Sequence, residues 1–184
     1  MRPWALLMAL GCGLAAAQER VEICYNWSCI AQAEVVYGSE QLREVERLLA
    51  LADDDESERA LLSQALGRLY RWAGEQSDVG HDRGGNQWDG EVYGRMDCID
   101  HSTSTTRLLR LLERQGWLRW HRVLEPVRRT RFVLGQHFAA AIETVDTGEA
   151  PARFAVDTWF MDNGEPAVIL PLESWLRGEG PDVE

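Results

Sequence analysis

The chain of 184 residues contains no lysine, and all 19 of its basic residues are arginine. We attribute this bias to the base composition of the genome rather than to function. Basic residues are also far fewer than the 30 acidic ones, and the formal net charge is −11. So acidic a chain is a poor partner for nucleic acid and for anionic membrane surfaces, and we expect neither as a partner.

A long apolar segment is also lacking. The apolar run from Trp4 to Leu14 falls well short of the ~20 residues that a membrane-spanning helix needs, so no membrane span is expected. The run follows Met1-Arg2-Pro3 and precedes Ala15-Ala16-Ala17, which is the pattern of a secretory signal peptide. We predict that residues 1–17 are this signal peptide, cleaved near Ala17, and that the mature protein is periplasmic or secreted. A lipoprotein attached through Cys12 is the alternative.

Cysteine is scarce, with four residues in the chain. Three remain after removal of the signal peptide. In an oxidising compartment, the neighbouring Cys24 and Cys29 are expected to close a small disulfide loop. Cys98 is then left over, and an unpaired thiol in an exported protein is reactive, paired with another chain, or buried and inert. A zinc site built from the three cysteines is an alternative, but no histidine follows at ligand spacing, and we expect no metal.

Local patterns predict one domain over residues 18–184, with no repeat and no low-complexity tract. Apolar residues from Leu42 to Leu49 recur at helical spacing after Ser39, a candidate N-cap. A second helical pattern, from Leu61 to Trp72, ends at a glycine. The two form a predicted helical hairpin. The polar, glycine-rich segment that follows, Gly74 to Arg95, is a surface loop or a binding loop.

A third helix is predicted from about Cys98 to Gln115, with Gly116 as its C-terminal stop. The chain then changes to strand patterns separated by turn residues such as Asp162-Asn163-Gly164. The predicted strands cover 123–124, 131–134, 137–143, 153–160 and 167–170, and 172–176 is a last helical turn. The expected fold is therefore α+β, with an N-terminal helical hairpin and a core helix packed on an antiparallel sheet.

Cys98 begins the stripe of its helix that faces the sheet. A thiol there needs a histidine to become a nucleophile. His137 heads one predicted strand, where Ala139 leaves open space on the same face, and Asp157 lies on the next strand. A turn centred on Thr147 would set His137 directly across from Asp157, whereas the longer loop that Pro151 suggests would shift this register by a residue or two. The two strands would then supply a base and the group that orients it, and the helix would supply the nucleophile.

The segment Asp97-Cys98-Ile99-Asp100-His101-Ser102, the leucine-rich helix that ends at Gly116, and His137 and Asp157 on consecutive strands resemble the transglutaminase-like cysteine protease superfamily. Papain-like cell-wall peptidases are its more distant relatives. The resemblance implies a papain/transglutaminase-like fold with Cys98 as nucleophile, His137 as base and Asp157 as orienter, without a cofactor. It also implies an exported amide hydrolase or acyltransferase that acts on peptide or peptidoglycan-like substrates. Asn163 is a rival orienter.

An oxyanion would need hydrogen-bond donors, and the backbone N–H of Cys98 at the helix start is one. Gln87 or Asn86 in the glycine-rich loop is a candidate second donor, and Trp88 and Trp159 are candidates to line a substrate cleft. Two other functions stay open. One is a catalytically inactive transglutaminase-like binding module of the cell envelope, and the other is a metal-dependent hydrolase that uses His and Asp residues.

Overall fold

The computed structural model describes residues 18–85, 88–131, 135–145, 148 and 150–182. The predicted signal peptide with Cys12, and the predicted oxyanion residues Asn86 and Gln87, lie outside these residues. Within the described ranges, no helix is both long and apolar enough to cross a membrane.

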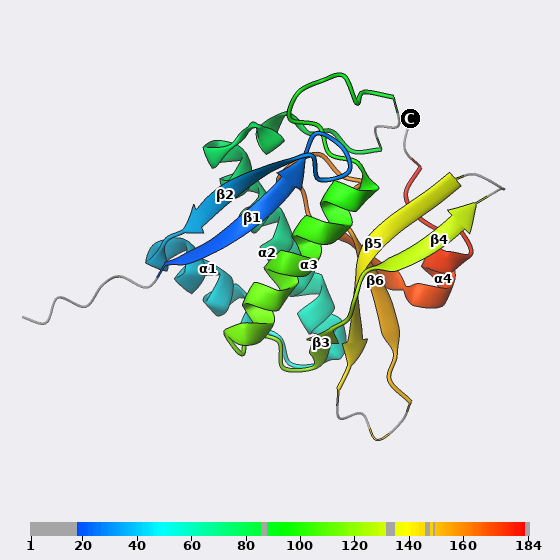
Figure 1. Cartoon of the computed structure of the whole chain (residues 1–184). Coiled ribbons are helices and arrows are strands. Elements are labelled where there is room, and N and C mark those ends of the chain that lie inside the picture. Colours follow the sequence, from blue (N-terminus) through cyan, green and yellow to red (C-terminus); the bar gives the residue numbers. More distant parts are fainter. Residues whose placement is uncertain (1–17, 86–87, 132–134, 146–147, 149, 183–184) are drawn as a thin grey trace, which may run out of the picture.

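A β-hairpin that we did not predict opens the described chain. Strands β1 (Glu19–Tyr25) and β2 (Ala31–Tyr37) pair antiparallel from Glu19 opposite Tyr37 to Tyr25 opposite Ala31. In β1 the apolar Val21, Ile23 and Tyr25 are buried, as expected for a strand with one face on the core, and the alternation is broken only by Cys24, which is also buried. The hairpin lies along one side of helix α3 (Figure 1).

The predicted helical hairpin is present as α1 (Ser39–Leu49) and α2 (Asp55–Gln76). Two details were wrong. The N-cap of α1 is Gly38 rather than Ser39, and the Gln41 side chain accepts its N–H at 2.9 Å. Helix α2 also continues past Gly74, where a Cβ atom would lie 2.8 Å from Gly80 Cα. This glycine therefore allows a close approach of the 3-10 helix η1 (Asp78–His81) instead of ending the helix.

Helix α3 (Cys98–Arg114) begins at the predicted residue. The Asp97 side chain caps it by accepting the N–H groups of Ile99 at 2.9 Å and Asp100 at 2.8 Å. Gly116 follows with φ at +72°, which is the left-handed conformation that commonly ends a helix. The apolar face of α3 consists of four fully buried leucines: Leu108, Leu109, Leu111 and Leu112.

An antiparallel sheet covers the other side of α3 (Figure 1). Its strands are β3 (His121–Val123), β4 (Val127–Arg131), β5 (Gly135–Thr144), β6 (Arg153–Asp157) and β7 (Val168–Pro171). Their order is β3-β5-β6-β7, and β4 also pairs with β5, so the long β5 is the centre of the sheet. The short helix α4 (Leu172–Leu176) follows and packs against β4, β6 and β7. The predicted α+β class with an antiparallel sheet is confirmed.

Candidate active site

Strands β5 and β6 bring His137 and Asp157 together. The imidazole Nε2 of His137 lies 2.7 Å from Oδ2 of Asp157. The predicted register was wrong by two residues, because Ala140 pairs with Val156, which places Asp157 opposite Ala139. The shift lies within the one or two residues that the longer loop suggested by Pro151 allows. A two-residue shift keeps both side chains on one face of the sheet, so the two still meet as diagonal neighbours.

The carboxylate of Asp157 is enclosed and fixed by hydrogen bonds. Its residue is 1% exposed. Besides His137, Oδ2 accepts the indole N–H of Trp175 at 2.8 Å, and Oδ1 accepts the backbone N–H of Trp159 at 3.2 Å. A buried carboxylate needs such donors, and they fix the direction in which it faces the imidazole. We did not predict that Trp175 would donate to Asp157, because the sequence pattern of residues 172–176 indicated only one apolar helical turn.

Cys98 lies beside the strand that carries His137. The partly exposed thiol begins α3, its Sγ lies 4.0 Å from the carbonyl oxygen of Gln136, and its interaction with the His137 ring raises the pKa of that histidine. Since Nε2 is directed at Asp157, Nδ1 is the ring nitrogen left for the sulfur. His137 therefore interacts with both of the other predicted residues, with Asp157 through a hydrogen bond and with Cys98 through its effect on the pKa of the ring.

The imidazole of His137 favours its protonated form. Burial by itself lowers the pKa of His137. The hydrogen bonds to Asp157 and Cys98, together with charge interactions with the same two groups, outweigh burial and raise the pKa from 6.5 to about 9. At neutral pH the ring is therefore an imidazolium held between a carboxylate and a sulfur.

Aromatic rings surround the imidazole. Trp159, which we predicted to line the substrate cleft, packs edge-on against His137 with ring centroids 4.9 Å apart. Phe160 at 5.8 Å and Trp175 at 5.6 Å complete this aromatic surround. Trp88 is 94% exposed, and no ring contact is recorded for it in the described chain. These rings limit water around the histidine and fix its plane.

The rival orienter Asn163 is not part of this site. Its side-chain oxygen lies next to Gly74 of α2, 2.6 Å from where a Cβ of that glycine would stand. The turn that contains Asn163 is present, with Glu165 N–H donating to the Asp162 carbonyl at 3.0 Å. Asp157 is therefore the residue that contacts His137.

The predicted Cys24–Cys29 disulfide is confirmed, and it closes an unusual loop. Residues 26–29, none of them glycine, all have φ between +55° and +65°. Left-handed backbone of this kind costs ~1–2 kcal/mol per residue, so the loop must be held by its surroundings. The disulfide also uses two of the three sulfurs of the alternative zinc site, which contradicts that alternative.

This left-handed loop is bound to the start of α3. The backbone N–H groups of Trp27 and Cys29 donate to the Asp100 carboxylate at 2.8 and 2.5 Å, and the N–H of Ser28 donates to Asp97 Oδ2 at 2.9 Å. Burial, and the negative charge of Asp97, raise the pKa of Asp100 to about 6. The backbone N–H donors of the loop act in the opposite direction, lower the pKa of Asp100 and so favour its charged form.

Two other histidines are paired with buried carboxylates and cannot reach a substrate. His101 Nε2 lies 3.0 Å from Asp82 Oδ2, and His121 Nδ1 lies 2.8 Å from Glu58 Oε1. All four side chains are 4% exposed or less. They are structural pairs of the core, whereas His137 shares its site with a partly exposed thiol.

No protein-family model, curated protein or solved structure matches this chain. The site is therefore interpreted from its own residues and geometry.

Proposed function

We propose that this protein is an exported thiol enzyme that acts on amide bonds, with Cys98 as nucleophile, His137 as acid and base, and Asp157 as orienter. The observation that carries the proposal is that the His137 ring is hydrogen-bonded to Asp157 at 2.7 Å while the sulfur of Cys98, at the start of α3 and 4.0 Å from the carbonyl oxygen of the neighbouring Gln136, raises the pKa of the same ring. A nucleophile, a base within hydrogen-bond reach and a third group that orients the base are the parts that covalent acyl transfer requires. The arrangement resembles that of papain-like and transglutaminase-like enzymes.

In the proposed reaction the Cys98 sulfur, as thiolate, attacks the carbonyl carbon of an amide and forms a C–S bond. Negative charge develops on the carbonyl oxygen. As first residue of α3, Cys98 has a backbone N–H with no acceptor inside the helix, so this group is a candidate oxyanion donor. The imidazolium of His137 gives its proton to the amine as the C–N bond breaks, which leaves a thioester and a neutral imidazole.

The thioester is released in a second step. Neutral His137 takes a proton from water, or from an acceptor amine, as that group attacks the thioester carbon. Cys98 leaves as thiolate and the imidazolium is restored. Asp157 keeps its hydrogen bond to the ring and fixes its orientation throughout. Peptide or peptidoglycan-like amides are the proposed substrates, Trp159 a candidate part of the substrate cleft, and the periplasm or the exterior the proposed location. No cofactor takes part in either step.

The test is the pH dependence of Cys98 alkylation by iodoacetamide. If His137 acts on the thiol, the reaction midpoint of the wild type lies well below the ~8.5 of an ordinary cysteine, and His137→Ala returns it to that value. His81→Ala is the matched control, because His81 is exposed and is outside the site. A wild-type midpoint near 8.5 that His137→Ala leaves unchanged would overturn the proposal.

Turnover is then measured on peptidoglycan-derived peptides and on amide substrates with an added amine acceptor. We expect Cys98→Ala to abolish both hydrolysis and transfer. Peptide binding without turnover, unchanged in Cys98→Ala, would instead support the inactive binding module.

A further inference from the structure

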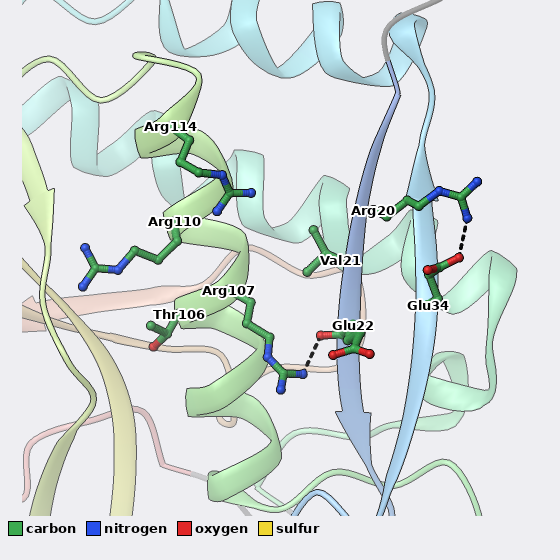
Figure 2. Close-up of a pocket in the computed structure, with 8 residues that line it drawn as sticks. All are labelled: Arg20, Val21, Glu22, Glu34, Thr106, Arg107, Arg110 and Arg114. Carbon is green, nitrogen blue, oxygen red and sulfur yellow. Dashed lines mark hydrogen bonds and ion pairs between the residues drawn. The ribbon is translucent and has the colours of Figure 1, made fainter.

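A groove of about 430 Å³ lies between strand β1 and helix α3, and its lining is rich in arginine (Figure 2). Its volume is in the range of small-molecule sites. The groove is lined by Arg20, Val21, Glu22, Glu34, Thr106, Arg107, Arg110 and Arg114. Four arginines and two glutamates in one groove contrast with the strongly acidic composition of the whole chain.

Two of the four arginines are already neutralised. Arg20 forms an ion pair with Glu34 across the hairpin. Arg110 pairs with Glu113 at 2.9 Å and with Glu125 at 3.4 Å, and its side chain points away from β1 in Figure 2. These two guanidinium groups therefore add little to the binding of an anion.

Neither of the other two arginines pairs with a carboxylate among the residues that the structure describes. Arg107 donates to neutral acceptors only, the carbonyl oxygen of Glu22 at 2.9 Å, the side chain of Gln32 at 3.1 Å and the sulfur of Cys24 at 3.5 Å. Arg114 makes no hydrogen bond or ion pair with any part of the chain that the structure describes, and in Figure 2 its guanidinium extends toward β1. The exposed Glu22 side chain offsets only part of these two charges.

The spacing of the two arginines defines the ligand. Seven residues make about two helical turns, so Arg107 and Arg114 stand on one face of α3, about 10 Å apart along its axis. Between them, on the side of α3 that faces β1, lies the buried and uncharged side chain of Val21 (Figure 2). Guanidinium groups bind phosphate and carboxylate through paired hydrogen bonds.

We propose that this groove binds a small molecule with two anionic groups, phosphate or carboxylate, held about 10 Å apart by an uncharged middle. One end pairs with Arg107 and the other with Arg114. A long polyanion is disfavoured, because the net charge of −11 repels it outside the groove.

This site is separate from the candidate thiol site. Arg107 follows Cys98 by nine residues, about two and a half turns, so the two side chains leave opposite faces of α3. Cys98 faces the sheet, and Arg107 and Arg114 face the hairpin. Binding here can be measured without any thiol chemistry, and failure of one proposal leaves the other standing.

The experiment compares two probes by isothermal titration calorimetry at low salt, 1,8-octanebisphosphonate and the much shorter methylenebisphosphonate. We expect the long probe to bind the wild type roughly tenfold more tightly than the short one, because only the long probe spans both arginines. Arg114→Gln is the decisive variant, since this side chain holds no other part of the fold. It should remove most of the affinity for the long probe, roughly tenfold or more.

Arg43→Gln is the matched control. Arg43 is an exposed arginine of α1 whose ion pair is with Glu40, and its loss should leave binding of the long probe unchanged. No binding of the long probe, equal affinity for the two probes, or an Arg114→Gln variant that binds like the wild type would each overturn the proposal.

Discussion

Replacing Asp157 with asparagine tests the electrostatics of the site most directly. The raised pKa of His137, about 9 against an ordinary 6.5, corresponds to about 3 kcal/mol in favour of the imidazolium in the folded state. Asp157 and Cys98 supply this energy against the opposing effect of burial. Asp157→Asn keeps the size and one oxygen of the side chain but removes its charge. We therefore expect the pKa of His137 to fall by more than about one unit.

The assay is an NMR titration of the His137 ring, with unfolding free energy measured over the same pH range. In the wild type the folded pKa is raised, so stabilisation by His137 is complete below pH 6.5 and is lost as the pH rises through about 9. In Asp157→Asn the unfolding free energy should therefore depend less steeply on pH over this range. Cys98→Ser should lower the pKa of His137 as well. A His137 ring that still titrates near 9 in Asp157→Asn would refute the assignment of the carboxylate as its main partner.

Two further predictions concern stability. Replacing Cys24 and Cys29 together by alanine opens a short loop and should lower the unfolding free energy by about 2 kcal/mol in urea denaturation, and an unchanged midpoint would contradict this. Gly84→Ala should lower the unfolding free energy by more than about 2 kcal/mol, because its Cβ would lie 2.3 Å from the Phe160 carbonyl oxygen. The Cβ of Gly116→Ala would meet nothing within 4 Å, so this variant should lose only the ~1 kcal/mol that left-handed backbone costs. Equal losses of stability in the two glycine variants would contradict this, because they would show that the backbone around Phe160 can make room for a Cβ at residue 84 without strain.

The parts of the site that follow from local pattern could be predicted from the sequence. A helical stripe that begins at Cys98, and strand alternation around His137 and Asp157, each fix which way a side chain faces. The register could not be predicted, because it depends on the length of a loop that pattern does not define. The donor from Trp175 could not be predicted either, since a contact between distant segments leaves no periodic signal.

The missed β1–β2 hairpin has a different cause. Its first strand does alternate, with Val21, Ile23 and Tyr25 on the buried face. Its connection, however, contains none of the glycine-rich turn chemistry that identifies hairpins, because residues 26–29 take up left-handed backbone without a glycine. The carboxylates of Asp97 and Asp100 hold that backbone, and such support is visible only in three dimensions.

The contact between Trp175 and Asp157 has a consequence for how the protein is made. The ribosome adds Trp175 long after Cys98 and His137, and 18 residues after the carboxylate that its indole binds. A nascent chain that stops short of α4 already contains the thiol, the imidazole and the carboxylate, yet Asp157 still lacks its buried indole donor. Translation therefore adds the Cys98 thiol early and the indole that supports Asp157 late, so a chain still being synthesised lacks the complete set of contacts around Asp157.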